Sequence, residues 1–339
     1  MRSQHVTIKD IANELGFSVS TVSRALKNHP DISEETKRLV NELAEHLRYT
    51  PNPIALSLKN RSSSMIGVIV PEVVHYFFAT VISGIEDVAE RNGYSLMLMQ
   101  SSEQLSKEVT AVANVMKGRV DGVLASVSKQ TNTYEHFQKL MDEHIPLVFF
   151  DRVADDVDTT HITVDDFGGA YSATKHLIGQ GCKNIVHFAG PQNRKIFRDR
   201  LNGYRQALEN NGLFFKPELV VAADTLDKGA FETQRLLAQG VVFDAIFAVN
   251  DFTAAGAMRA LKEAKKAIPQ DVALVGFGDE SITLMLEPNF SSVHQSGYEM
   301  GQKAMEHLLM QIHSEDKLPT EQVVLPAELV IRESSMRLS

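Results

Sequence analysis

Residues 6–26 read VTIKDIANELGFSVSTVSRAL, and this stretch decides how the N-terminal part of the chain folds. Thr7 and Asp10 stand where a capping pair begins a helix, and apolar residues recur behind them at helical spacing. Gly16 can end that helix because glycine tolerates a positive φ, and a second helix can begin at Val19. Two short helices joined by a tight turn that contains glycine predict a helix-turn-helix.

A third helix is predicted to begin near Ser33 and to carry an apolar stripe from Leu39 to Leu47. In a helix-turn-helix, the second helix enters the major groove of DNA and presents its first residues to the base edges. The pattern alone also fits a small helical bundle that caps the larger part of the chain. Both interpretations stay open at this point.

The linker at residues 49–61 (YTPNPIALSLKNR) makes the prediction specific. Pro53 fits the first turn of a short helix, which would be unstable alone and would need a partner helix and a DNA surface. Three stretches, at residues 6–12, 18–24 and 49–58, match in order the head and hinge of the lactose-repressor/galactose-repressor family. The chain therefore resembles that family of transcription regulators.

The resemblance implies a DNA-binding head at residues 1–61, with a hinge helix at about 51–60, and an effector-binding and dimerisation body at residues 62–339. Within the head, Val19, Ser20 and Arg24 would read bases in the major groove. Leu58 would wedge between base pairs in the minor groove, beside its twin from a second subunit. The complete implied set of DNA-contacting residues is Thr7, Ser18, Val19, Ser20, Thr21, Ser23, Arg24, Asn28, Tyr49, Asn52, Ala55, Leu58 and Lys59.

Charge is distributed unevenly along the 339 residues. The whole chain carries a formal net charge of −9, whereas residues 1–61 carry +2 and the remainder carries −11. A mildly basic end on an acidic body suits a head that faces DNA and a body that does not bind it unspecifically. The single cysteine, Cys182, excludes an intrachain disulfide and indicates a reducing compartment. With neither a secretory signal nor a membrane-length apolar run in the sequence, we expect a cytoplasmic protein.

Beyond residue 61, short apolar runs alternate with amphipathic stretches, which predicts parallel sheets with helices on both faces. The predicted strands lie at residues 65–70, 95–99, 122–125, 147–150, 161–164, 185–188, 245–249 and 273–276. The predicted helices lie at residues 77–91, 105–117, 167–179, 201–211, 252–264 and 298–313.

An internal repeat indicates two similar lobes. Residues 120–125 (VDGVLA) resemble residues 243–248 (FDAIFA), and after each comes a strand followed by an acid, Asp151 or Asp279. The predicted fold is an α/β body of two doubly wound parallel-sheet lobes with an all-α head, and the body resembles the periplasmic-binding-protein fold that the family carries. The lobes are expected at 62–164 plus 295–323 and at 165–292 plus 325–339, with crossings near 164–166, 292–295 and 323–325.

The effector site is expected in the cleft between the lobes, because ligands of such sheets bind at the carboxyl ends of the strands. Aromatic rings there can stack on a sugar or a base, and carboxylates, amides and arginine forks can bind its polar groups. From their places at strand ends and from the resemblance, the predicted effector-binding residues are Tyr76, Phe77, Asp151, Asp165, Arg194, Arg200, Asn250 and Asp279.

Two details qualify this set. Arg200 is the strongest single candidate, whereas Asp165 would serve equally well as the cap of the helix that follows it. Many relatives place Asp or Asn directly after the aromatic residue at Phe277, but here that position is Gly278 and the acid Asp279 comes one residue later. This departure leaves the effector open between a sugar or sugar derivative and a nucleoside or purine.

Rival functions find less support in the sequence. Tyr171 and Lys175 have the spacing of a hydride-transfer pair, but residues 68–74 contain no glycine of a dinucleotide-binding loop. The histidines show no metal-ligand spacing, so we predict no enzyme, no cofactor and no metal. A solute-binding protein for uptake would need an export signal and would not carry residues 6–61.

The expected mechanism is that of a regulator. A homodimer would set two heads on a near-palindromic double-stranded operator, and the effector would change operator affinity through the angle between the first lobes and the pairing of the hinge helices. We expect repression relieved by a ligand. The sequence does not separate repression from activation, and a regulator that needs a purine or nucleoside corepressor stays open. Residues 331–339 add no leucine-heptad helix, so a dimer is expected rather than a tetramer.

Overall fold

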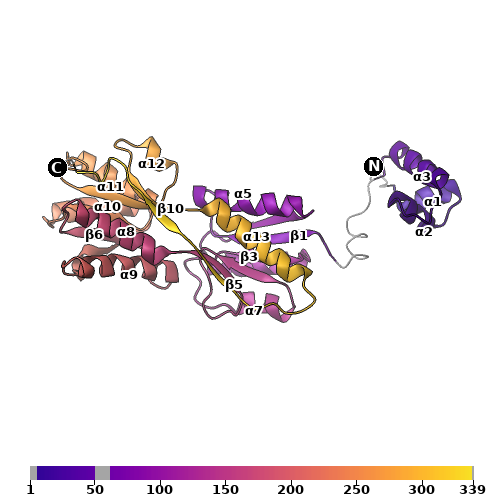
Figure 1. Ribbon diagram of the computed structural model, residues 1–339, viewed down its shortest axis with the longest axis horizontal. Helices are drawn as coiled ribbons and strands as arrows, with labels where there is room; N and C mark the ends of the chain where they lie inside the picture. Colours follow the sequence, from indigo (N-terminus) through magenta and orange to yellow (C-terminus); the bar gives the residue numbers. More distant parts are fainter. Residues whose placement is uncertain (1–5, 50–61, 338–339) are drawn as a thin grey trace. The chain divides into compact units, whose positions relative to one another are not determined.

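The computed structural model describes residues 6–49 and 62–337, which fall into two compact units, Met1–Ser64 and Met65–Ser339 (Figure 1). The boundary predicted after residue 61 lies three residues before that division. The predicted hinge helix at residues 51–60 lies outside the described residues. The same holds for the predicted DNA contacts Asn52, Ala55, Leu58 and Lys59.

The first unit is a helix-turn-helix followed by a third helix, as predicted. Its helices are α1 (Ile8–Leu15), α2 (Val19–Leu26) and α3 (Glu34–His46). Thr7 and Asp10 form a capping box at the start of α1, and Gly16 ends the helix with a φ of 68°. The three helices bury a small apolar core made of Ile11, Ala12, Val22, Ala25, Val40 and Ala44.

The second unit contains two lobes, each built on a six-stranded sheet. The first lobe contains β1 (Met65–Val70), α5 (Tyr76–Arg91), β2 (Ser95–Gln100), α6 (Leu105–Lys117), β3 (Gly122–Ala125), α7 (Glu135–Asp142), β4 (Leu147–Phe150), β5 (Thr160–Val164), α13 (Gly297–His313) and β11 (Gln322–Leu325). Its strands are all parallel, in the order β11-β5-β4-β3-β1-β2.

The second lobe repeats this arrangement, with strand order β12-β10-β9-β8-β6-β7. It contains α8 (Asp166–Gly179), β6 (Ile185–Ala189), α9 (Lys195–Asn210), the 3-10 turn η1 (Pro217–Leu219), β7 (Val220–Ala222), α10 (Leu226–Ala238), β8 (Ala245–Ala248), α11 (Asp251–Glu263), β9 (Ala273–Gly278), α12 (Ile282–Met285), β10 (Ser291–Gln295) and β12 (Ala327–Val330). The sequence repeat falls on β3 and β8, which occupy the same place in the two sheets. Asp151 and Asp279, which directly follow the equivalent strands β4 and β9, have the same left-handed backbone, with φ of 58° and 54°.

Three crossings join the lobes, and each has one residue between its flanking elements. Asp165 separates β5 from α8, Ser296 separates β10 from α13, and Pro326 separates β11 from β12. The last two crossings lie slightly beyond their predicted positions. Strand β12 runs antiparallel to β10, unlike the parallel sheet predicted, because it enters its sheet at the edge where the parallel strands end.

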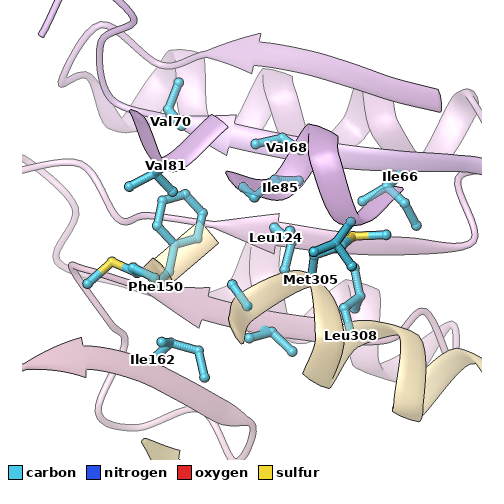
Figure 2. Packing of buried hydrophobic residues seen from close by; sticks show 14 of the residues in the cluster. Ile66, Val68, Val70, Val81, Ile85, Leu124, Phe150, Ile162, Met305 and Leu308 are labelled. Atoms are coloured by element: carbon cyan, nitrogen blue, oxygen red, sulfur yellow. The ribbon is translucent and has the colours of Figure 1, made fainter. Parts of the chain in front are cut away.

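Helices cover both faces of each sheet, and the side chains between them form the cores. Figure 2 shows this packing in the first lobe, where Val68 on β1 and Phe150 on β4 lie among side chains of α5 and α13 such as Ile85 and Met305. Continuous apolar strands of this kind are buried on both faces.

Glycines set the distance between the paired helices. An added Cβ at Gly84 on α5 would overlap the backbone of α13, and one at Gly203 on α9 would overlap the backbone of α8. Between α10 and α11, Gly229 meets the carbonyl of Thr253 and Gly256 meets the carbonyl of Leu226. Each pair of helices is therefore in backbone contact, which only glycine permits.

Some elements were not predicted from the sequence. Helices α7, α10 and α12 and strands β7, β10, β11 and β12 were missed, and α9 begins at Lys195 rather than at residue 201. Gly229 interrupts the apolar pattern of α10, yet it is the residue that lets α10 approach α11. A pattern that reads glycine as a breaker misses a helix whose glycine is a packing contact.

We predict that Gly256→Ala lowers the free energy of unfolding of the body by about 1–3 kcal/mol, because the added Cβ forces α10 and α11 apart. The matched control is Gly179→Ala, at an exposed position of α8 where an added Cβ meets nothing. It should be neutral or stabilise by up to about 1 kcal/mol. Urea unfolding followed by circular dichroism measures both, and equal effects would contradict the close-contact role.

Candidate effector cleft and DNA-binding surface

A cavity of about 370 Å³ lies at the carboxyl ends of the strands and is lined by residues of both lobes. This is the position at which doubly wound sheets bind ligands. Its apolar wall consists of Phe77, Phe78, Ile196, Phe197, Leu226, Phe252 and Phe277. Flat rings of this kind can stack on the face of a sugar or a base.

The basic side chains that line the cavity are all paired with acids. Arg152 pairs with Glu103 at an N···O distance of 2.7 Å. Lys129 pairs with Asp224, and His75 with Glu72, each at 2.9 Å. Arg152 donates from Nη1 to both carboxylate oxygens of Glu103. Pairing of this kind offsets the cost of removing the charges from water.

Arg200 is fixed by contacts within the second lobe. Its Nε and Nη2 both lie 2.8 Å from Oδ1 of Asp166, and its Nη1 donates to the carbonyl of Val249 at 2.6 Å. The guanidinium lies 3.6 Å from the centre of the Phe277 ring. Burial raises the pKa of Asp166 to about 6, although Arg200 acts in the opposite direction. Arg200 therefore lines the cavity and also holds its neighbours Asp166, Val249 and Phe277 in place.

Asp151 is a buried carboxylate of the cavity that keeps most of its acceptor capacity. It accepts a hydrogen bond from the Ser126 hydroxyl at 3.3 Å, and Nε of Arg152 lies 3.7 Å away. Burial raises the pKa of Asp151, and the arginine charge acts against that rise. Oxygens with so few donors can accept hydrogen bonds from a ligand.

Four of the eight predicted effector residues line the cavity, and they are Phe77, Asp151, Arg200 and Asn250. The amide of Asn250 also has a local role, because its oxygen accepts from the Thr253 N–H at the start of α11, and its nitrogen donates to the Asp224 carbonyl.

The structure places the other four predicted residues away from the cavity wall. The side chain of Tyr76 is half exposed, and Asp165 caps α8 by accepting from the Gly168 N–H at 2.8 Å. Arg194 is buried and donates to the hydroxyl of Tyr134 at 3.1 Å. The carboxylate of Asp279 pairs with Arg332 at 2.7 Å. The carboxylates of Asp165 and Asp279 and Nη1 of Arg194 are thus engaged by the protein itself.

Several cavity residues were missed, and their common signal is a place just after a strand. Glu103 follows β2, Lys129 follows β3 and Asp224 follows β7. Asp224 could not be found without β7, which the sequence pattern did not predict. The acid that the segment after β9 contributes to the cavity is Glu280, one residue beyond the predicted Asp279.

A buried carboxylate explains the glycine that departs from the family pattern. Asp251, at the start of α11, is fully buried and accepts hydrogen bonds from the Ser292 hydroxyl at 2.5 Å and from the Glu280 N–H at 2.7 Å. A Cβ at Gly278, whose φ is 131°, would lie 3.1 Å from its Oδ2. Burial raises the pKa of Asp251 to about 7, and nearby Glu280 adds to the rise.

The head presents a polar surface around the first turn of α2. The hydroxyl of Ser18 caps the helix by accepting from the Thr21 N–H at 3.1 Å, and it contacts the hydroxyls of Ser20 and Thr21, each at 2.8 Å. Val19 is 42% exposed, although it is apolar. A helix N-terminus with exposed hydroxyls can bind phosphate and reach base edges.

Of the five remaining described DNA-contact candidates, Ser23 and Arg24 lie on α2 and Asn28 lies just after it, whereas Thr7 caps α1 and Tyr49 follows α3. Arg24, on the last turn of α2, and Asn28 are exposed, whereas Ser23 is half-buried. Thr7 is exposed, and its hydroxyl is hydrogen-bonded to Asp10 in the capping box. Tyr49 instead packs against the apolar core of the head, and burial raises the pKa of its hydroxyl.

Comparison with known proteins agrees with both parts of this description. Residues 7–52 match the model of bacterial regulatory proteins of the lacI family, and residues 174–335 match a periplasmic binding protein-like domain. A ribose operon repressor of Halalkalibacterium halodurans is 33% identical over 330 residues, which cover 97% of each chain.

Solved structures give the same picture. A Lac repressor dimer bound to operator and the anti-inducer ONPF superposes with a TM-score of 0.87, at 26% identity, over 98% of this chain and 100% of that one. A complex of the transcriptional regulator CelR with cellobiose gives a TM-score of 0.75, at 28% identity, over 97% and 99% of the two chains.

A helix-turn-helix head joined to a two-lobed ligand-binding body defines a class of ligand-responsive transcription regulators. The chain belongs to the lacI family of bacterial regulatory proteins. Within residues 6–49 and 62–337, no helix is long and apolar enough to cross a membrane, and no cluster of three or more His, Cys, Asp or Glu is placed to hold a metal ion.

We predict that Asp251→Asn flattens the pH dependence of stability. The carboxyl has a pKa of about 7 in the folded protein and an ordinary value of 3.8, so the stability from its extra proton is present at low pH and is lost as the pH rises through 7. Between pH 3.8 and pH 7, the free energy of unfolding of the wild type should fall by up to about 1.4 kcal/mol per pH unit relative to that of the variant.

Urea unfolding across this pH range provides the measurement. The control is Asp227→Asn, at an exposed carboxylate in the first turn of α10. Parallel profiles for the wild type and Asp251→Asn would contradict the raised pKa.

Proposed function

We propose that the protein is a repressor whose affinity for a near-palindromic DNA operator is controlled by an uncharged small molecule bound between the lobes. A homodimer carries the two heads, and the effector relieves repression. The single buried cysteine fits a reducing cytoplasm. The observation that carries the proposal is the presence in one chain of the exposed α2 surface and of an inter-lobe cavity.

The DNA-binding part of the proposal is supported by the chemistry of α2. Its capped N-terminus, its exposed hydroxyls and the Arg24 guanidinium are groups of the kinds that bind phosphates and base edges in a major groove. The Lac repressor structure that this chain resembles is a dimer bound to its operator. Two-fold symmetry of a dimer requires two-fold symmetry of the DNA site.

The charge of the cavity supports an uncharged effector. Five acids line it, and they are Glu72, Glu103, Asp151, Asp224 and Glu280. Every basic group that lines it already has an acidic partner, so an incoming phosphate or carboxylate would have to displace one. A ligand rich in hydrogen-bond donors would instead meet the remaining acceptor capacity of the Asp151 carboxylate and the phenylalanine rings. A sugar, sugar derivative or nucleoside meets these requirements.

Selection from random duplex DNA at physiological salt tests the proposed function. The full-length protein should recover a near-palindromic consensus. The variant Arg24→Ala should bind it about 1–3 kcal/mol more weakly and should relax one base position in each half-site. Arg38→Ala is the control, because Arg38 is exposed on α3 and pairs with Glu42. A pool without consensus, in the presence of sugars and nucleosides as well as in their absence, would contradict the proposal.

The proposed effector class is tested by thermal shift with matched pairs of compounds. D-ribose is compared with ribose 5-phosphate, adenosine with adenosine monophosphate, and cellobiose is tested alongside. An uncharged compound should raise the melting temperature by mass action, and its phosphorylated counterpart should raise it less. If only phosphorylated compounds raise it, the charge argument fails while the DNA-binding proposal stands.

A further inference from the structure

One segment of the first lobe, which follows β3, carries polar contacts across the rim of the cavity. Nζ of Lys129 lies 2.9 Å from Oδ2 of Asp224, and the Lys129 carbonyl accepts from Nδ2 of Asn193 at 2.9 Å. The hydroxyl of Tyr134 accepts from Nη1 of Arg194 at 3.1 Å. These five residues, two from the first lobe and three from the second, are called the rim clasp below.

The segment is held from behind by a carboxylate that faces the interior. Glu108 on α6 is fully buried, and it accepts hydrogen bonds from the Ser128 N–H at 2.6 Å, from the Thr131 hydroxyl at 2.7 Å and from His136 Nε2 at 2.8 Å. Burial acts to raise the pKa of Glu108, but these hydrogen bonds together lower it. The site is therefore built for an ionised carboxylate.

The partners of Glu108 bracket both clasp residues of the first lobe. Ser128 directly precedes Lys129, and Thr131 and His136 stand on either side of Tyr134. Hydrogen bonds to a charged acceptor are about twice as strong as neutral ones, so the carboxylate is a firm anchor for this segment. A second tie is the Lys129 N–H, which donates to Oε2 of Glu103 at 2.8 Å.

We infer that Glu108 is a positioning residue for closure of the two lobes. It holds the segment after β3 in the one shape that lets Lys129 and Tyr134 reach the second lobe, and so it sets how firmly the rim clasp closes over the cavity. The inference rests on the proposed function only in treating closure as the step to which the effector couples. Closure itself is a property of the body.

Glu108 can act on the second lobe through this segment. Its hydrogen-bond partners Ser128, Thr131 and His136 all belong to the first lobe. A residue that merely stabilised its own lobe would alter amide exchange there and leave exchange across the cavity unchanged. Exchange at the second-lobe rim, around Asn193 and Asp224, therefore separates positioning from ordinary stabilisation.

Hydrogen–deuterium exchange of the full chain, without DNA or effector, tests the inference. Glu108→Gln should speed exchange on the order of tenfold at residues 126–134 and also at the second-lobe residues 190–195 and 222–226, with β8 unchanged. Glu135→Gln, an exposed acid beside His136, is the matched control and should change neither region. The double variant Lys129→Met/Tyr134→Phe removes the two side-chain contacts of the clasp and should also speed exchange at the second-lobe rim, although by less than Glu108→Gln, because the Lys129 carbonyl can still accept from Asn193.

Three results would overturn the inference. Faster exchange confined to residues 126–134 would make Glu108 a local anchor without a role in closure. Faster exchange throughout the body would make it a general stabilising residue. An unchanged second-lobe rim in Lys129→Met/Tyr134→Phe would mean that the clasp does not hold the lobes, and this variant leaves Glu108 and its buried partners in place. Because the assay uses no DNA and no effector, its failure is distinct from failure of the proposed function.

Discussion

The direction of the strands constrains the rest of the body. The parallel strands of each sheet end at the edge where that lobe meets the other, so the residues that follow them converge on one cavity. The same constraint turns β12 antiparallel, because a chain that enters a sheet at this edge can only run away from it. Asp151 and Asp279 share a left-handed backbone because each is the residue at which the chain leaves a parallel strand and changes direction.

Charges in the cleft follow from burial at that edge. An ion removed from water needs a partner, and the pairs of Arg152 with Glu103 and of Arg200 with Asp166 supply one within each lobe. The pair of Lys129 with Asp224 differs because it joins the two lobes. The ion pairs within a lobe fix the walls of the cavity, whereas the ion pair between Lys129 and Asp224 can form only when the two lobes are close together.

The sequence predicts those features that depend on local pattern. Continuous apolar runs such as β1, β3 and β4 and the capping box at Thr7 and Asp10 are read directly, because each is formed by neighbours in the chain. Helix α10 was not predicted, because the role of Gly229 depends on its contact with a carbonyl that is distant in the sequence. The prediction named Asp279 as the cavity acid instead of Glu280 for a similar reason. Arg332, which is distant in the sequence, pairs with the Asp279 carboxylate. Half of the predicted effector residues line the cavity. Of the others, Arg194 and Asp279 are held by distant partners that no local pattern reveals, whereas Asp165 forms the local cap that the sequence offered as its alternative role.

The single-residue crossings at Asp165, Ser296 and Pro326 limit how the body can move. Glycine contacts bring the backbones of the helix pairs within each lobe together, so a change in the angle between the lobes is expected to fall on the torsions of the three short junctions. Three parallel connections permit one shared rotation and resist twisting or sliding, and the fixed φ of proline removes a further degree of freedom. With so few free torsions, a molecule bound in the cleft would change mainly the angle between the lobes.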